Sequence, residues 1–195
     1  MRILHVVHQY PPEHMSGAEL YTQSLAGALA QRGHEVTVFY RRSAEGAGQA
    51  LSSEGPVRLW AAWSGRVTPT RRFLAAFGAP ALARAFERAL DASQPELVHV
   101  QHLMGLPNAI ARAVQRRGLP IVITLHDYWW MCANAQLLTN DQGRICGGPR
   151  GYLDCARCAL ARAGQPAPWA ARLALAPALA WRNHRLRRIL RSAAL

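Results

Sequence analysis

Five short runs of apolar and β-branched residues constrain the fold of this chain more than any other feature. They are centred near residues 3, 36, 58, 97 and 121, and segments with helical spacing separate most of them. Strands that alternate with helices form βαβ units, and near-continuous apolar strands indicate a parallel sheet covered by helices on both faces. The sequence therefore predicts one α/β, Rossmann-like domain.

The segments between the runs predict helices and one loop. Helical spacing is found over residues 17–32, 70–93 and 108–117. Pro80 should begin or kink a helix, because proline lacks the N–H that a helix interior needs. Residues 43–55 are rich in Ser, Gly, Ala and Glu and predict a loop. Pro177 is expected to divide the last segment into two helices.

Length and composition limit the class of protein. A chain of 195 residues, half of them hydrophobic, can bury one sizeable core, whereas two full domains would be crowded. There is no run of 18 apolar residues, so a transmembrane helix is not expected. The chain begins directly with a strand, which argues against a signal peptide. The expected location is cytoplasmic.

The positive charge is concentrated at the C-terminal end. Residues 155–195 contain eight arginines and no acidic residue, so they hold +8 of the net charge of +12. Leu179, Leu186 and Leu190 share one face of a basic amphipathic helix. That helix predicts either core packing with solvated arginines or peripheral contact with the inner face of a membrane. No nucleic-acid-binding motif is present, so no nucleic-acid partner is expected.

The loop that follows the first strand, residues 8–19, has features of a binding site. Ser16 is the expected N-cap of the next helix, with Glu19 at the capping-box position. Gly17 lets a ligand approach backbone N–H groups at the positive end of that helix, which favours an anion. Ligands in such folds bind outside the carboxyl ends of the strands. The loop predicts a seat for a phosphate or a sugar, and the alternative is an ordinary capped turn.

A second candidate site follows the fifth strand, where His126 and Asp127 precede an aromatic cluster. An imidazole can donate to or accept from a sugar hydroxyl, and its charge is adjustable near neutral pH. Asp127 would orient that ring or pair with an arginine, and the alternative is that it caps a short helix. His102 lies just past the carboxyl end of a neighbouring strand and is a further candidate.

Together these two stretches resemble the retaining glycosyltransferases of family four. The first match is a strand, then Tyr-Pro-Pro at residues 10–12, then Ser-Gly-Ala-Glu at residues 16–19, similar to the Gly-Gly-x-Glu turn of that family. The second is Leu-His-Asp at residues 125–127, followed by aromatic residues. The resemblance implies the GT-B architecture, in which two Rossmann-like domains face each other across a cleft.

The resemblance also implies an activity. A hexosyl group would move from a nucleotide-sugar donor to a hydroxyl of a carbohydrate or lipid-linked acceptor, as in cell-envelope polysaccharide biosynthesis, without a catalytic metal. His126, with Asp127 beside it, would lie near the transferred sugar, and Gly17 would meet the phosphate of the donor. Family members bind the nucleotide mainly through a second domain, which these residues do not include. We therefore expect an acceptor-side, amino-terminal domain that is incomplete at its C-terminus and inactive alone.

All four cysteines fall within a 27-residue window with the spacing C-x13-C-x8-C-x2-C. They are Cys132, Cys146, Cys155 and Cys158. In a reducing compartment such a cluster indicates a metal site before disulfides. Four thiolates suit a closed, structural zinc site within a cysteine-rich insertion over residues 128–165. An iron–sulfur cluster and free thiols are the alternatives.

Two hypotheses of different classes follow. The first is the glycosyltransferase domain, and the second is a non-catalytic, zinc-stabilised Rossmann-like module that binds a membrane or protein partner. A nicotinamide oxidoreductase is excluded, because the first turn lacks G-x-G-x-x-G and Glu19 is not a ribose-binding acid. The enzyme hypothesis requires Gly17 and His126 to face the same side of the sheet edge.

Overall fold

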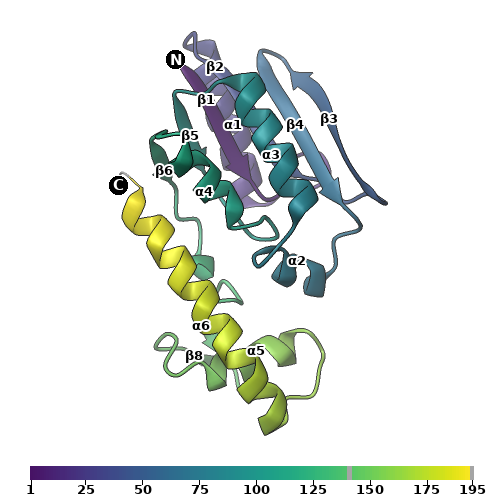
Figure 1. Cartoon of the computed structure of the whole chain (residues 1–195), viewed down its shortest axis with the longest axis vertical. Helices are drawn as coiled ribbons and strands as arrows, with labels where there is room; N and C mark the ends of the chain where they lie inside the picture. The colour runs from purple at the N-terminus through teal and green to yellow at the C-terminus, as the bar shows by residue number, and fades with distance from the viewer. Residues whose placement is uncertain (140–141, 194–195) are drawn as a thin grey trace. The chain divides into compact units, whose positions relative to one another are not determined.

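The computed structural model describes residues 1–139 and 142–193. The chain divides into two compact units: the first contains Met1–His126 together with Ser192, and the second contains Asp127–Arg191. The predicted cysteine-rich segment over residues 128–165 lies wholly within the second unit, which also contains most of a long helix. Each unit is described by itself below (Figure 1).

A six-stranded sheet forms the centre of the first unit. Its strands are β1 (Arg2–Val7), β2 (Glu35–Arg41), β3 (Ala47–Glu54), β4 (Val57–Ser64), β5 (Leu97–Val100) and β6 (Ile121–Ile123). The spatial order is β3-β4-β2-β1-β5-β6, and only the β3–β4 pair is antiparallel. All five predicted strands are present and mutually parallel, which confirms the predicted α/β sheet.

The order of the strands locates the crevice where a ligand is expected. The chain passes from β1 outward to β2 and β4, then returns to the other side of β1 to form β5 and β6. This reversal makes a topological switch point between β1 and β5. In doubly wound sheets, ligands bind beyond the carboxyl ends of the strands at such a point.

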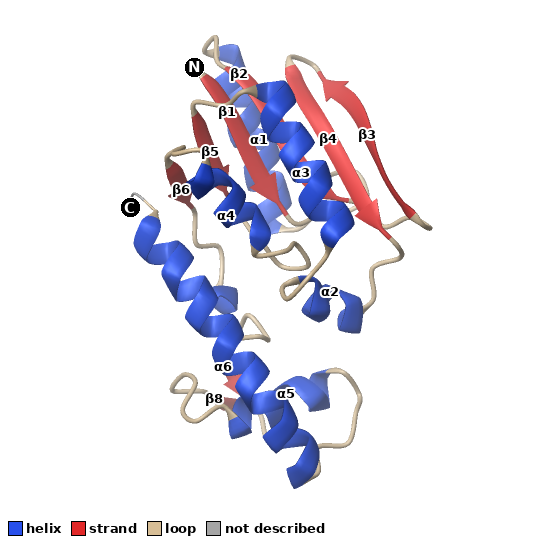
Figure 2. Ribbon diagram, in the orientation of Figure 1, coloured by secondary structure: helices blue, strands red, loops and turns tan. Residues whose placement is uncertain are grey.

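Helices cover both faces of this sheet. They are α1 (Gly17–Gln31), α3 (Pro80–Ser93) and α4 (Ala109–Arg116), and the first unit also contains the short helix α2 (Pro69–Ala75). Figure 2 shows α1 behind the sheet, with α3 and α4 in front. Pro80 is the first residue of α3, where the missing N–H costs no hydrogen bond, so the segment predicted over 70–93 forms two helices.

Alternation along β1 divides its side chains between two cores. Val6 lies beside Phe39 in the register, and Phe39 packs edge-on against Phe86 of α3 with ring centroids 5.1 Å apart. Val7 belongs to the opposite core, where it clusters with Ala26 of α1. His5 is two residues from Val7 and therefore points to the α1 face as well.

The prediction of a loop over residues 43–55 was wrong for most of that range, because β3 forms a hairpin with β4. Glu54 pairs with Val57, and the turn between them contains Gly55 at a φ of +54°. The side chains of β3 are half-buried or exposed. An edge strand that buries so little apolar surface lacks the alternation that identifies a strand.

The second unit is built from short elements and two helices. They are the 3₁₀ helix η1 (Tyr128–Trp130), β7 (Leu138–Thr139), β8 (Arg144–Ile145), α5 (Leu153–Arg162) and α6 (Trp169–Ser192). The predicted break at Pro177 is wrong, because α6 runs through it. Pro177 is exposed, so water can reach the backbone carbonyl that loses its partner, while Ala176 and Leu179 beside it are buried.

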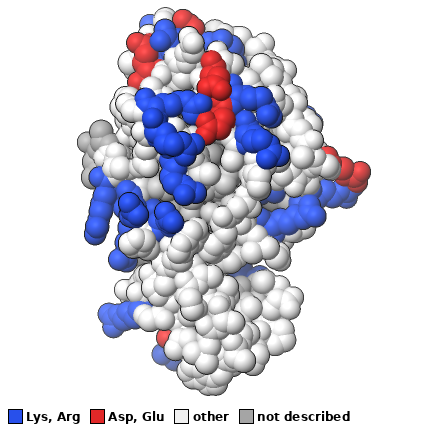
Figure 3. Space-filling view, in the orientation of Figure 1, with Lys and Arg blue, Asp and Glu red and all other residues white. Residues whose placement is uncertain are grey.

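Charge and hydropathy give two further findings about the described residues. Figure 3 shows acidic side chains flanked by arginines on the face that carries α3 and α4, where Arg117 pairs with Glu87 and Asp91. Within residues 1–139 and 142–193, no helix has the length and apolar character needed to cross a membrane. The proposed contact of α6 with a membrane surface stays a prediction.

Candidate functional site

The helix after β1 begins where the sequence predicts. Ser16 has the extended backbone of an N-cap, α1 starts at Gly17, and Glu19 is its third residue. The side-chain bond differs from the predicted capping box, because the Ser16 hydroxyl donates to Glu19 Oε2 at 2.5 Å and does not cap the backbone. A Cβ built on Gly17 would meet nothing within 4 Å, so the approach to the start of the helix is open.

A buried carboxylate joins this turn to the ends of two strands. Glu19 is fully buried, and its Oε1 lies 3.1 Å from Nε2 of His8, the first residue after β1. The ring of His8 lies 4.5 Å, centroid to centroid, from that of His102, which follows β5. The structure therefore brings Ser16, Glu19 and His102 together at the switch point. His8 was not predicted as a site residue, although its place directly after β1 was the available signal.

His126 contacts a second polar group on the α1 face. Its Nε2 donates to Oε1 of Gln101 at 2.9 Å, and the ring of Tyr21 lies edge-on at 5.1 Å. Tyr21 follows Gly17 by four residues in α1, so both lie on one side of that helix. His126 and Gly17 are thus associated with the same face of α1. Gln101 is fully buried, and its Nε2 lies 3.3 Å from Nδ1 of His5.

Two histidines beneath this group are held neutral. Burial, followed by the charge of His99, lowers the pKa of His5 to about 3. Burial, followed by the charge of His126, also lowers the pKa of His99. The rings of His5 and His99 lie 5.0 Å apart across the β1–β5 pair. The floor of the site is therefore polar but uncharged at neutral pH.

Asp127 begins the second unit and acts as a cap. Its Oδ1 accepts a hydrogen bond from the backbone N–H of Trp129 at 2.8 Å, at the start of η1. This is the structural alternative that the sequence left open for Asp127. The catalytic roles of His126 and Asp127 stay predictions.

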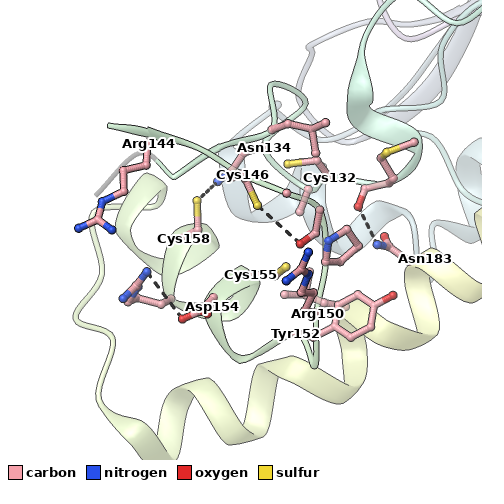
Figure 4. Close-up of a pocket in the computed structure, with 18 of the residues that line it drawn as sticks. Cys132, Asn134, Arg144, Cys146, Arg150, Tyr152, Asp154, Cys155, Cys158 and Asn183 are labelled. Atoms are coloured by element: carbon pink, nitrogen blue, oxygen red, sulfur yellow. Dashed lines mark hydrogen bonds and ion pairs between the residues drawn. The ribbon is translucent and has the colours of Figure 1, made fainter. Parts of the chain in front are cut away.

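The four cysteines line one pocket of the second unit, with a volume of about 320 Å³ (Figure 4). Cys132 follows η1, Cys146 follows β8, and Cys155 and Cys158 lie one turn apart on α5. Burial is the main cause that raises the pKa of Cys155 to about 11, and the three other thiols add to it. All four cysteines therefore lie around the same pocket.

The predicted zinc ligand set is not formed in this arrangement. Within the described parts of the chain, no group of three or more His, Cys, Asp or Glu side chains is placed to hold a metal ion. Cys158 Sγ accepts from Asn134 Nδ2 at 2.6 Å, and Cys146 Sγ donates to the carbonyl of Gly148 at 3.7 Å. All four cysteines are free of disulfides. Metal binding would require these side chains to turn toward one another.

Several solved structures resemble the chain weakly. The catalytic domain of starch synthase IV from Arabidopsis thaliana, bound to ADP and acarbose, is 14% identical, with 66% of this chain and 34% of that chain covered and a TM-score of 0.42. A trehalose-6-phosphate structure from E. coli, bound with UDP-2-fluoro glucose, is 12% identical. The match covers 65% of this chain and 33% of that chain, with a TM-score of 0.44. The α,α-trehalose 6-phosphate synthase from Burkholderia multivorans is 16% identical. The match covers 64% of this chain and 32% of that chain, with a TM-score of 0.43. The chain spans about a third of the length of these structures.

A family model matches most of the chain. No curated protein matches the sequence. The model of Glycosyltransferase Family 4 matches residues 15–194, which include the turn at Ser16, the ends of β5 and β6, and the whole second unit. Because this match spans most of the chain, the protein belongs to glycosyltransferase family 4.

Proposed function

We propose that this chain is the acceptor-side domain of a glycosyltransferase that moves a sugar from a nucleotide-sugar donor to a hydroxyl acceptor with retention of configuration. The observation that carries the proposal is the group of polar side chains at the carboxyl ends of β1 and β5, in a chain that belongs to family 4. The GT-B architecture of this family would supply the nucleotide-binding half as a second domain. The proposed location is cytoplasmic, at the inner face of the membrane.

In this proposal the protein positions the reactants and stabilises charge. The bond from the anomeric carbon to the donor phosphate breaks, a bond to the acceptor oxygen forms on the same face, and the departing phosphate takes the hydroxyl proton. No protein nucleophile is then needed. The open N-terminus of α1 at Gly17 would stabilise the departing diphosphate through backbone N–H groups and the helix dipole. His126 would contact a sugar hydroxyl.

Side chains within residues 8–19 fix the conformation of the turn that precedes α1. The bond from Ser16 to Glu19 and the contact from Glu19 to His8 join α1 to the end of β1. These contacts leave the first-turn N–H groups without a side-chain cap, which is the arrangement that an anion can use.

Titration of the 195-residue chain with ligands, monitored by NMR, tests the proposal. Inorganic pyrophosphate, UDP-glucose and ADP-glucose are the probes, and we expect shifts of the Gly17 amide and the His126 ring. Gly17→Ala should weaken pyrophosphate binding about tenfold, because a methyl group would fill the approach to the backbone. Gly27→Ala is the matched control, since a Cβ there also meets nothing within 4 Å but lies inside α1.

The same titration separates the two functional hypotheses. If none of the probes moves the signals of Gly17 and His126 while vesicles of anionic phospholipid bind the chain, the non-catalytic binding module is favoured. In α6, Trp169 and Trp181 are exposed, and Arg172 and Arg185 stack on their rings at 4.2 and 5.1 Å, a composition suited to such a surface. Binding to neutral vesicles alone would contradict that alternative too.

A structural zinc ion in the second unit is part of the proposal. It is supported by the presence of all four cysteines in the lining of one pocket and by the Cys155–Cys158 spacing on α5. We expect about one equivalent of zinc in the chain purified without chelator, and loss of helix signal from the second unit when the metal is removed.

A serine substitution identifies the ligands. Cys155→Ser should release the metal, whereas Ala159→Ser, on the same helix, should keep it. Mass spectrometry of bound metals measures both variants. Less than about half an equivalent of zinc or iron in the unmodified chain would remove the metal claim and leave free thiols.

A further inference from the structure

We propose that Arg41, Arg71 and Arg72 form a binding site for a phosphoryl group, carried by the acceptor. The assignment of that group to the acceptor rests on the proposed function, whereas the anion site itself does not. The phosphoryl group could belong to a sugar phosphate or to a lipid headgroup. These residues were not among the candidates that the sequence suggested.

The three arginines gather beyond the carboxyl ends of three parallel strands. Arg41 is the last residue of β2, and its Nη1 donates to the carbonyl of Gly105, in the loop after β5, at 2.8 Å. A Cβ built on Gly105 would lie 3.1 Å from Nη1 of Arg41 and 3.1 Å from Cγ of Arg72, so both side chains pack against this glycine. The third arginine, Arg71, lies over Gly65, the residue after β4.

Both glycines also have a backbone conformation that favours glycine. Gly65 and Gly105 have φ values of +96° and +76°, in the left-handed region that favours glycine. A Cβ at Gly65 would collide with Nη1 of Arg71. The guanidinium groups of Arg71 and Arg41 therefore lie against glycines in the loops after β4 and β5, at the edge of the sheet where ligands bind.

The positive charge of this group is not compensated. Arg41 is 4% exposed, and its Nε has no hydrogen-bond partner among the described residues. Within residues 1–139 and 142–193, none of the three arginines forms an ion pair; the pairs use other arginines. Burial, then the charges of Arg72 and Arg71, lower the pKa of Arg41. A buried cation that faces two others is costly without an anion.

The chemistry of the group points to a phosphoryl ligand. A guanidinium presents N–H donors in a planar fork that matches the oxygens of phosphate, and several arginines together can neutralise its double charge. Arg71 is exposed and Arg72 half-buried, so the site is open to solvent on one side. Arg41 contacts the loop after β5 that also carries His102, a residue of the polar cluster of the proposed active site.

Inorganic phosphate is the first probe, and the Nε–H signal of Arg41 in the NMR spectrum is the readout. We expect phosphate to shift this signal and to raise the melting temperature of the chain. The double variant Arg71→Gln and Arg72→Gln should weaken phosphate binding at least about tenfold. Arg84→Gln, an exposed arginine of α3, is the matched control and should leave binding unchanged. Because Arg71 is exposed and Arg72 is only half-buried, the test does not depend on a variant of the buried Arg41.

Two further ligands, a sugar phosphate and a phospholipid, distinguish the source of the phosphoryl group. Glucose 6-phosphate that binds more tightly than phosphate indicates a sugar phosphate, and vesicles that contain phosphatidic acid indicate a lipid headgroup if they bind better than either. An Arg41 signal that phosphate does not move, or binding that the double variant retains, would overturn the site. Phosphate at the arginines without any effect of nucleotide sugars on Gly17 and His126 would keep the anion site and reject the glycosyltransferase proposal.

Discussion

Lowering the pH from 7 to 4 is expected to remove about 3 kcal/mol from the free energy of unfolding of the first unit through His5 alone. The ring is fully buried, and its pKa falls from 6.5 to about 3 on folding. Below pH 6.5 the unfolded chain binds a proton at His5 that the folded chain does not accept until about pH 3. The contribution is therefore complete above pH 6.5 and is lost progressively as the pH falls.

Chemical denaturation of the unmodified chain and of His5→Asn, at both pH values, measures this effect. Asparagine keeps a hydrogen-bonding group near Nδ1, where Gln101 lies, but does not titrate in this range. The unmodified chain should lose about 3 kcal/mol more than the variant between pH 7 and 4. His184→Asn, at an exposed position in α6, should follow the unmodified chain. Equal losses in the unmodified chain and His5→Asn would contradict the prediction.

Replacing Arg182 with alanine is expected to lower the free energy of unfolding of the second unit by about 3 kcal/mol. Arg182 is 1% exposed, and burial lowers its pKa to about 10, so it stays charged at neutral pH. Its Nη2 donates to the carbonyl of Trp129 and its Nη1 to Oδ1 of Asn183, both at 2.8 Å. The guanidinium also lies 4.4 Å above the ring of Trp129. Alanine would leave these acceptors without a donor, together with a cavity.

Equilibrium unfolding, followed by tryptophan fluorescence, measures this loss. Arg182→Lys should be intermediate, because an ammonium cannot donate to both acceptors in the geometry of the planar fork. Arg187→Ala, an exposed arginine of the same helix, should change the stability by less than about 0.5 kcal/mol. If Arg182→Ala proves as stable as Arg187→Ala, Arg182 does not hold η1 against α6.

The parts of the fold that were predicted depend on local signals. The apolar runs of β1, β2, β4, β5 and β6 are visible because a parallel sheet buries both of its faces. The start of α1 was visible because Ser16, Gly17 and Glu19 have a spacing that only a helix start explains. Strand β3 has no such signal, because an edge strand with exposed side chains can have almost any polar composition.

The candidate site was predicted only where its residues lie just past a predicted strand or at the start of the next helix. His102 and His126 lie just past strands, and Ser16 is the expected N-cap of the first helix. The coupling of His5 to Gln101, and of Glu19 to His8, depends instead on contacts across the sheet and between strand and helix. The partners of His5 lie more than 90 residues away in the chain, so no local pattern reveals them. The cluster around Arg41 was missed for the same reason, since the end of β2, helix α2 and the loop after β5 build it together.

The central position of β1 has a consequence for synthesis on the ribosome. Strand β1 leaves the exit tunnel before β5, so it can pair with β2 on one side but receives its other neighbour only after Leu97–Val100 have been made. Until then one edge of an apolar strand stays open to other chains, which is the state that chaperones recognise and that aggregates when they are absent. Nascent chains halted before β5 should therefore be protease-sensitive, and those extended past β6 should resist digestion.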